Sequence, residues 1–349
     1  MIIIWTKEKV KQYRQGAWNM NSPKCDDLDY IHFLIAAQKA FTCTEAARCQ
    51  PEGKAPAHDA FTRLLRRRQP DTEVLWREAK ELVNREAGLL VLDDITLDKP
   101  YARNMELVTY HWSGKHQRVV RGINLQTLLW TDGKALIPCD FRVYAKAQDG
   151  KDKNDHFQDM LGEAKEWGFQ PGFVLFDSWY ASLENLKKIR GYGLHWLMRL
   201  KSNRLVNPDG KDNVPIKKVE VPPEGKIVHL RGYGFIKVFR IASQNGDEEY
   251  GASDDLQMDE TTRDELEGQG RDIEVYHRGI KQCCGIERAQ VRKAVAQKNH
   301  FLYALRAFLR LEVHKLRTGI SWYQAKLSII REAIRAYLTY PAYSLVPNA

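Results

Sequence analysis

The spacing of apolar residues changes twice along the chain, and the changes divide it into three parts. Up to about residue 87 the spacing is helical, and it predicts helices over residues 31–41, 59–68 and 74–83. A loop rich in Pro and Gly, residues 50–57, separates the first two. Helical spacing returns near residue 259 and continues, with breaks, to residue 340. The sequence therefore predicts helical segments at both ends.

Between these ends the apolar runs are short, as in strands that are buried on both faces. They predict strands over residues 89–96, 105–112, 118–130, 135–144, 173–176 and 194–200, with helices over residues 154–169 and 181–189. The Asp-Gly pair at residues 132–133 is a hairpin signal. This order predicts an α/β fold, namely a ribonuclease-H-like mixed sheet with helical segments before and after it.

A basic segment interrupts this core after residue 200. Residues 228–241 alternate between apolar and polar and contain a turn, as a β-ribbon does. The segment from Lys201 to Arg240 contains nine Lys or Arg and only four Asp or Glu. We therefore expect a β-strand insertion at about residues 203–253. The expected division is a helical N-terminal DNA-binding domain (1–87), a catalytic domain with this insertion (88–300) and a helical C-terminal segment (301–349).

Composition narrows the class of protein. The 349 residues carry a formal charge of +9 and a pI of about 9.1, which permits a polyanionic partner. No apolar run has the length of a membrane span, and residues 1–5 are too short for the core of a signal peptide. The six cysteines have neither zinc-ligand nor disulfide spacing, so we expect reduced thiols. The arginines at 63 and 66–68 suit phosphate contacts, with a solvated helix face as the alternative.

Acidic residues end two of the predicted strands. Asp93 and Asp94 lie in the run at residues 89–96, and Asp177 follows the run at residues 173–176. Carboxyl ends of strands are where open α/β sheets place their ligands. Alone, Asp177 would be interpreted as the cap of the next helix.

A third acid lies in the predicted helix at residues 271–282. At about 100° per residue, Glu274, Arg278 and Lys281 share one face. An adjacent apolar stripe would pack that helix on the core; it consists of Ile273, Ile280 and Cys284. Three carboxylates suit Mg²⁺, and two such ions about 4 Å apart can serve phosphoryl transfer. The alternative is a surface helix with a Glu–Arg pair.

Other residues near these acids have ordinary interpretations. His277 is expected on the surface of its helix, although it could touch phosphate. Cys283 and Cys284 are expected to pack in the core. Trp179 and Tyr180 are expected to be core aromatics, with stacking on a flipped base as the alternative.

Four motifs then occur in one order: LDDITLDKP at 92–100, FDSWYAS at 176–182, LKSNR at 200–204 and IEVYHRGIKQ at 273–282. Together they resemble the DDE transposases of bacterial insertion sequences, over residues 31 to about 340. The resemblance implies Mg²⁺-dependent strand cleavage and transfer at the terminal inverted repeats of an element, with Mn²⁺ as a second candidate cation. It also implies a cytoplasmic, nucleoid-associated protein that acts outside membranes, as a homodimer or higher assembly on double-stranded element-end and target DNA.

The resemblance also assigns roles to residues. Asp93 or Asp94 corresponds to the first metal-binding acid, Asp177 to the second and Glu274 to the third, while Lys281 matches the family's Lys after the Glu. Expected DNA contacts, from the resemblance and from charge, are Arg66, Arg67, Lys217, Lys218, Arg231, Lys237, Arg271 and Arg278.

Two positions depart from the family pattern. The family often has Tyr seven residues and Arg four residues before the Glu, where this chain has Glu267 and Gly270. Arg271 is a substitute one position later. The departures leave two alternatives to an active transposase: a catalytically impaired DNA-binding remnant, and a stand-alone ribonuclease-H-like nuclease.

Overall fold

The computed structural model describes residues 24–53, 55–114, 116–242 and 248–341. The expectations for residues 1–23, including the comparison with a signal peptide, lie outside these ranges. No helix in the described ranges is long and apolar enough to cross a membrane.

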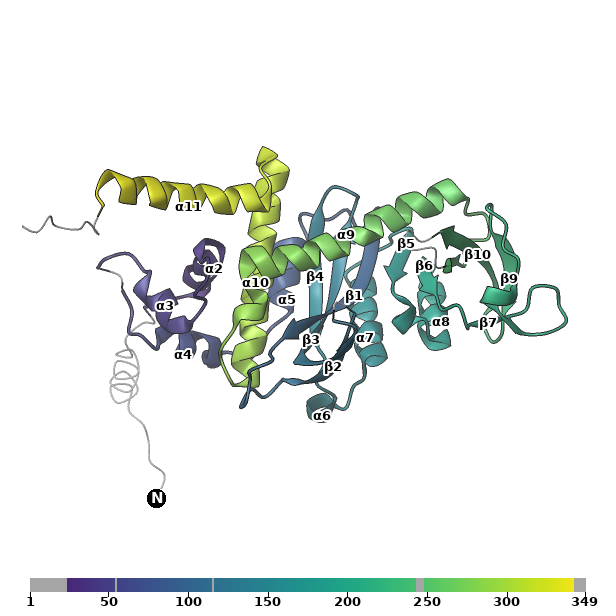
Figure 1. Cartoon of the computed structure of the whole chain (residues 1–349), viewed down its shortest axis with the longest axis horizontal. Helices are drawn as coiled ribbons and strands as arrows, with labels where there is room; N and C mark the ends of the chain where they lie inside the picture. The colour runs from purple at the N-terminus through teal and green to yellow at the C-terminus, as the bar shows by residue number, and fades with distance from the viewer. Residues whose placement is uncertain (1–23, 54, 115, 243–247, 342–349) are drawn as a thin grey trace, which may run out of the picture.

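A mixed sheet forms the centre of the molecule (Figure 1). Strand β1 (Leu89–Asp98) pairs antiparallel with the long β3 (Arg118–Thr131) and parallel with β5 (Phe173–Phe176), which pairs parallel with β6 (His195–Leu200). The outer edge of β3 is shared: β2 (Thr109–Ser113) pairs with its first part and β4 (Leu136–Val143) with its second. The predicted α/β class and the mixed sheet are confirmed.

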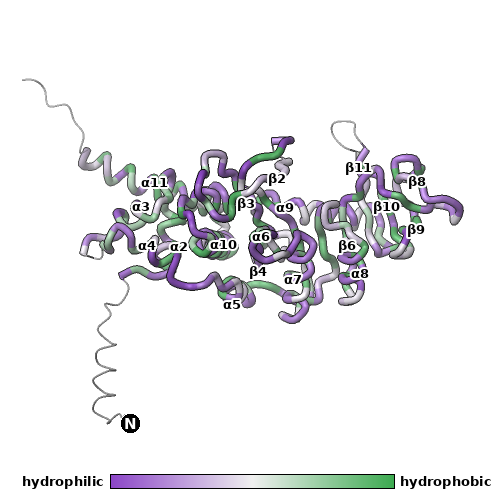
Figure 2. The backbone as a smooth tube through the Cα atoms, turned by 90° about the horizontal axis from the view of Figure 1, so that it is seen from below, coloured by the Kyte–Doolittle hydropathy of each residue, from purple (hydrophilic) through white to green (hydrophobic). Residues whose placement is uncertain are grey.

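The predicted β insertion extends this same sheet. Strand β11 (Glu248–Ser253) pairs antiparallel with β6, and β10 (Gly234–Ala242) and β9 (Lys226–Leu230) follow outward. Two short strands, β7 (Leu205–Val206) and β8 (Val214–Pro215), form a separate pair beside them. Figure 2 shows mostly hydrophilic positions at this far end, near β8.

Helices cover both faces of the sheet. Helices α7 (Lys153–Glu166) and α8 (Leu183–Gly191) pack on one face, and the 25-residue α9 (Glu260–Cys284) crosses the other. In Figure 1, α9 runs from the insertion to α10 (Ala294–Thr318). At its first turns Arg263 stacks on Phe239 of β10, with 5.2 Å between guanidinium carbon and ring centre. A single helix therefore joins the insertion to the helical end of the molecule.

The N-terminal helices pack on α10 as well as on one another. These helices are α2 (Asp27–Ala36), α3 (Cys43–Arg48), α4 (Ala60–Arg67) and α5 (Glu73–Ala79). Helices α2, α4 and α5 contact α10, and α3 contacts α4. On α10, Arg306 pairs with Asp27 at 3.0 Å and with Glu78 at 2.8 Å. The division expected between residues 300 and 301 falls inside α10, which is continuous.

Helix α11 (Trp322–Thr339) is held at its first turns by a close contact and two buried charges. A Cβ on Gly279 of α9 would lie 2.8 Å from the Trp322 ring, so only glycine permits this approach. The Trp322 indole N–H donates to Glu312 at 2.7 Å. The buried Lys326 ammonium donates to three carbonyls at the C-terminal ends of α2 and α9, those of Ile35, Ala37 and Cys283. These contacts fix where α9 ends relative to α2 and α11.

Several predicted boundaries were wrong. The helix expected at 31–41 is α2, which begins earlier because Asp26 caps it, and ends at Ala36 because Ala37 is extended. Thr42 caps α3, a helix that the apolar spacing did not predict. The strand expected at 105–112 is confined to β2, and the helix expected from residue 181 is preceded by the 3-10 turn η1 (Ser178–Tyr180).

Candidate active site

The predicted acids meet where β5 ends beside the middle of β1; the expectation that β1 ends at its acids was wrong, because pairing with β3 carries the strand on to Asp98. In the parallel register of β1 and β5, Leu92 stands opposite Phe176, so Asp93 and Asp177 follow side by side. A cavity of about 910 Å³ opens there, and the predicted catalytic side chains that line it are Asp93, Asp94, Asp177, Glu274 and Lys281. The structure thus brings together residues that are far apart in the sequence.

Asp93 and Asp94 point to opposite faces of the sheet, as neighbours on a strand do. Asp94 accepts hydrogen bonds from the Lys153 ammonium at 2.9 Å, the Tyr180 hydroxyl at 2.8 Å and the Asn124 amide. Burial alone would raise the pKa of Asp94, but Lys153 and these hydrogen bonds outweigh it, and the pKa is lowered. Asp94 is therefore an ionised anchor between β1, β3 and α7.

Asp93 has the opposite electrostatic surroundings. Its pKa is raised well above the ordinary value, first by burial and then by the charges of Asp94, Asp177 and Glu274. Asp93, Asp177 and Glu274 also line a second, adjoining cavity of about 350 Å³. The ionised form of Asp93 thus lies in an excess of negative charge that the surrounding side chains do not balance.

On α9, Glu274, His277 and Lys281 are the residues that line the larger cavity. The expected surface position of His277 was wrong, because this side chain lies on the side of α9 that packs against the sheet. His277 is buried, with its Nδ1 3.8 Å from Asp93 and its Nε2 3.3 Å from the Thr127 hydroxyl. Burial lowers the pKa of His277 to about 3, so the ring is neutral.

Lys281 is partly committed to the protein. Its ammonium donates to the carbonyl of Thr96 on β1 at 3.0 Å and lies 3.4 Å from Glu287. The lysine therefore holds α9 against the end of β1 while it faces the cavity. Arg278, which was expected on the same face, is exposed and is not among the residues that line either cavity.

The departures from the family pattern have a physical reason at Gly270. A Cβ there would lie 2.6 Å from Leu175 Cδ2 on β5, so a larger residue would require the Leu175 side chain to move. Arg271 and Glu267 line the smaller cavity beside Arg199 of β6. Arg199 Nη2 lies 3.3 Å from Glu267 Oε2, so the acid at this position pairs with a strand arginine.

The remaining predicted DNA contacts lie away from the cavity. Arg66 and Arg67 are exposed in the last turn of α4, at the N-terminal helical end. Lys217 and Lys218 lie on the 3-10 turn η2 (Ile216–Lys218). Arg231 is exposed in the turn after β9 and Lys237 lies on β10, both in the insertion. The structure places these charges at both ends of the molecule in Figure 1.

Three partners of Asp94 were missed from the sequence: Asn124, Lys153 and Tyr180. Asn124 gave a partial signal, because it is one of three polar residues in the middle of β3, with Gln126 and Thr127, and all three are buried. Tyr180 is a core aromatic, as expected. Trp179 is not: it is exposed, because η1 turns it to the other side of the chain. Cys283 and Cys284 are buried, as expected.

The donor set fits a hard divalent cation in charge and in chemistry. Asp93, Asp177 and Glu274 offer only carboxylate oxygens, the ligands that Mg²⁺ and Mn²⁺ prefer. A cation among them would offset the repulsion that raises the pKa of Asp93. Across the described ranges, no three His, Cys, Asp or Glu side chains already converge to metal-ligand separations. Binding an ion would therefore require these carboxylates to turn inward.

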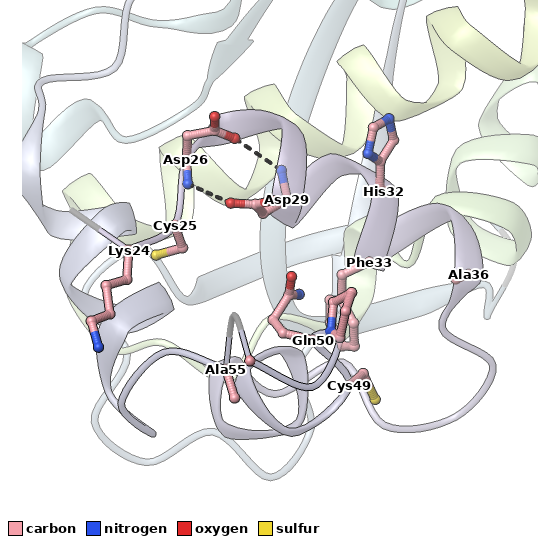
Figure 3. Close-up of a pocket in the computed structure, with 12 residues that line it drawn as sticks. Lys24, Cys25, Asp26, Asp29, His32, Phe33, Ala36, Cys49, Gln50 and Ala55 are labelled. Carbon is pink, nitrogen blue, oxygen red and sulfur yellow. Dashed lines mark hydrogen bonds between the residues drawn. The ribbon is translucent and has the colours of Figure 1, made fainter. Parts of the chain in front are cut away.

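A separate cavity of about 760 Å³ lies between α2 and the loop before α4 (Figure 3). Its two carboxylates, Asp26 and Asp29, form the reciprocal capping box of α2 and are already hydrogen-bonded. None of the predicted site residues lines it. The predicted site residues are concentrated in the cavity beside β1 and the end of β5.

The sequence model of the family described as DDE superfamily endonuclease matches residues 46–227, more than half of the chain. The chain belongs to this family. The matched range of the DDE endonuclease includes Asp93, Asp94 and Asp177, while Glu274 lies beyond it. A comparison with curated proteins gives no match.

Two solved structures are similar to this DDE endonuclease. A piggyBac transposase synaptic complex with hairpin DNA aligns with a TM-score of 0.53 at 10% identity, over 95% of this chain and 78% of that one. The shared feature is the fold. A Drosophila P element transposase strand transfer complex aligns with a TM-score of 0.30 at 10% identity, over 97% of this chain and 91% of that one, which is too low to carry an argument.

Proposed function

We propose that this DDE endonuclease is an insertion-sequence transposase that cleaves and transfers DNA strands at the terminal inverted repeats of its element. The observation that carries the proposal is the meeting of Asp93, Asp177 and Glu274 around one cavity, from the middle of β1, the end of β5 and a helix. The central strands, β4, β3, β1, β5 and β6, are three antiparallel and then two parallel, which supports a ribonuclease-H-like core.

We assign metal binding to Asp93, Asp177 and Glu274. Asp94 is left out because its oxygens already bind Lys153, Tyr180 and Asn124. Mg²⁺ is the expected cation, Mn²⁺ a second candidate, and divalent ions are in general use among endonucleases of this superfamily. Bound ions would activate the attacking oxygen and stabilise the charge on the leaving oxygen.

The chain's own residues orient the DNA and balance its charge. Lys281 presents an ammonium at the cavity wall beside Glu274, where a phosphate next to the scissile bond would bind. The ion pair of Asp94 with Lys153 fixes the middle of β1 against α7, which keeps Asp93 in place. The neutral His277 fills the space under Asp93 without adding charge.

DNA binding is assigned to both ends of the molecule. The exposed Arg66 and Arg67 on the N-terminal helices and the basic insertion would hold duplex away from the cavity. Arg271 lies at the smaller cavity, close to the carboxylates. Two element ends must be paired for transposition, so we propose a homodimer or higher assembly as the active form.

The test is to incubate the purified chain and Mg²⁺ with labelled DNA from the flanks of the element. We expect cleavage followed by joining of the cut strand to target DNA. Hydrolysis by water without any joining would indicate a stand-alone nuclease. Asp177→Asn should lower the cleavage rate a thousandfold or more and leave DNA binding in place. Binding without cleavage by the unchanged chain would identify an impaired remnant, which the substitutions Glu267 and Gly270 favour.

A further inference from the structure

Exposed aromatic rings surround the carboxylates of the candidate active site. Tyr110 and Trp112 on β2 are 74% and 67% exposed, and Trp179 on η1 is 59% exposed. All three line the 910 Å³ cavity together with Asp177 and Glu274. Single exposed aromatic side chains are common on proteins, but several that gather at one cavity mark a binding surface, and these three lie beside the carboxylates.

Tyr110 and Trp112 form one wall. They are two residues apart on a strand whose intervening residue, His111, is buried, so both rings stand on the same exposed face. Two residues of an antiparallel strand span about 6.8 Å, which leaves room between the rings for one base at the stacking distance of about 3.4 Å. Opposite Tyr110 on β3 lies Arg121, which adds a cation to this face.

Trp179 forms the second wall and carries cations on its ring. The Lys153 ammonium lies 5.5 Å and the Lys201 ammonium 5.7 Å from its ring centre. Its backbone N–H donates to Asp177, which ties the position of the ring to that of the carboxylate. Aromatic rings that alternate with cations are the combination that binds single-stranded nucleic acid without sequence preference.

We infer that Tyr110, Trp112 and Trp179 form a stacking slot for unpaired nucleotides next to the carboxylates. The ligand is a short single-stranded segment, such as a frayed end beside the scissile phosphate. The inference rests on the proposed function, because the slot shares its cavity with the proposed metal ligands. Duplex DNA, whose bases are already stacked, would gain nothing from these rings.

The experiment measures binding of the full chain to a labelled blunt duplex and to the same duplex with an oligothymidylate overhang, in EDTA so that no cleavage occurs. The overhang should bind more tightly than the blunt end. Trp112→Leu and Trp179→Leu should each weaken overhang binding roughly tenfold. Blunt-duplex binding and the slope of log K against log salt should stay unchanged, because no cation is lost.

Matched variants keep the result interpretable. Trp112→Phe and Trp179→Phe should retain most of the overhang affinity, since a ring remains, and Tyr101→Leu should have no effect, since Tyr101 is 93% exposed but outside the cavity. Equal binding of both probes, or Leu variants that bind the overhang normally, would overturn the slot. Absent cleavage with a retained overhang preference would overturn only the proposed function.

Discussion

Adjacent carboxylates with different surroundings define this site at the scale of single residues. Asp93 and Asp94 cannot be distinguished in the sequence, because they are neighbours in the same strand. Their partners come from β3, η1 and α7, which only the folded chain brings to Asp94. One residue is thereby stabilised as an anion, and the other is left among like charges.

This difference predicts opposite effects on stability in the absence of metal. Asp94→Asn should lower the free energy of unfolding by about 1–3 kcal/mol, because three donors lose a charged acceptor. Asp93→Asn should raise the melting temperature, because it removes a carboxylate that its neighbours repel. Thermal unfolding in EDTA measures both, with the exposed Asp212→Asn as a control. If Asp93→Asn were destabilised and Asp94→Asn were not, Asp93 would be the stabilised anion and Asp94 the carboxylate among like charges.

Lys281 has both a structural and a proposed functional contact. Lys281→Ala should cost about 1 kcal/mol of stability through the lost bond to Thr96, and should impair cleavage more than the stability loss explains. Lys281→Arg should keep part of the activity. Cleavage and melting assays on these variants and on the exposed Lys187→Ala check the prediction. Normal cleavage by Lys281→Ala would remove the residue from the site.

At the scale of elements, the apolar spacing predicted most helices and strands of the core and, in the insertion, the ribbon of β9 and β10, because each buries a regular stripe. It failed where the ends are set by caps, as with Asp26 before α2. It also misplaced His277, because the covered face of α9 depends on what packs above and below it. The 3.6-residue period gives the direction of a side chain but not its neighbours.

Helix α10 carries a buried histidine that joins three elements. His300 Nε2 donates to the Gly285 carbonyl at 3.1 Å, which leaves Nδ1 to accept from the Tyr30 hydroxyl at 2.9 Å. Burial lowers the pKa of His300 to about 4 from an ordinary 6.5. Between these pH values the unfolded chain binds the proton and the folded chain does not, so stability falls as the pH is lowered from 6.5 to 4.

Urea unfolding across that pH range should show a loss from His300 of about 3 kcal/mol. His300→Gln, which can still donate and accept, should lower the stability at neutral pH but reduce the loss on acidification. The exposed His32→Asn should leave the pH dependence unchanged. An equal pH dependence in the unchanged chain and in His300→Gln would show that other groups control acid stability.

At the scale of the whole molecule, positive charge is divided between two distant ends with the carboxylates between them. Charge counting found the basic insertion, because the nine Lys or Arg fall within one segment of the sequence, from Lys201 to Arg240. It could not show that β11 joins the insertion to the central sheet through β6. Nor could it show that the N-terminal helices share a core with α10, since these contacts span more than 200 residues.

Salt dependence tests the role of the insertion. Neutralising the four basic residues of the insertion should weaken duplex binding and lower the slope of log K against log salt by about 0.9 for each lost phosphate contact. The four are Lys217, Lys218, Arg231 and Lys237. A control neutralises the same number of charges elsewhere, at the exposed Lys80, Lys187, Arg331 and Arg335. Equal slopes in both variants would exclude the insertion as a DNA contact.

The close packing of Gly279 on Trp322 fixes α9 near its C-terminal end, so that Gly279 is the pivot of any rigid tilt of the helix. Glu274 lies about 7.5 Å from that pivot and the first residue of the helix, Glu260, about 28 Å. A rigid tilt that moves the insertion end by about 2 Å therefore moves the carboxylate by only about 0.5 Å, which is the tolerance of a productive site. With a ratio of roughly four to one between the two distances, Glu274 keeps its position relative to Asp93 and Asp177 when the insertion end of α9 shifts.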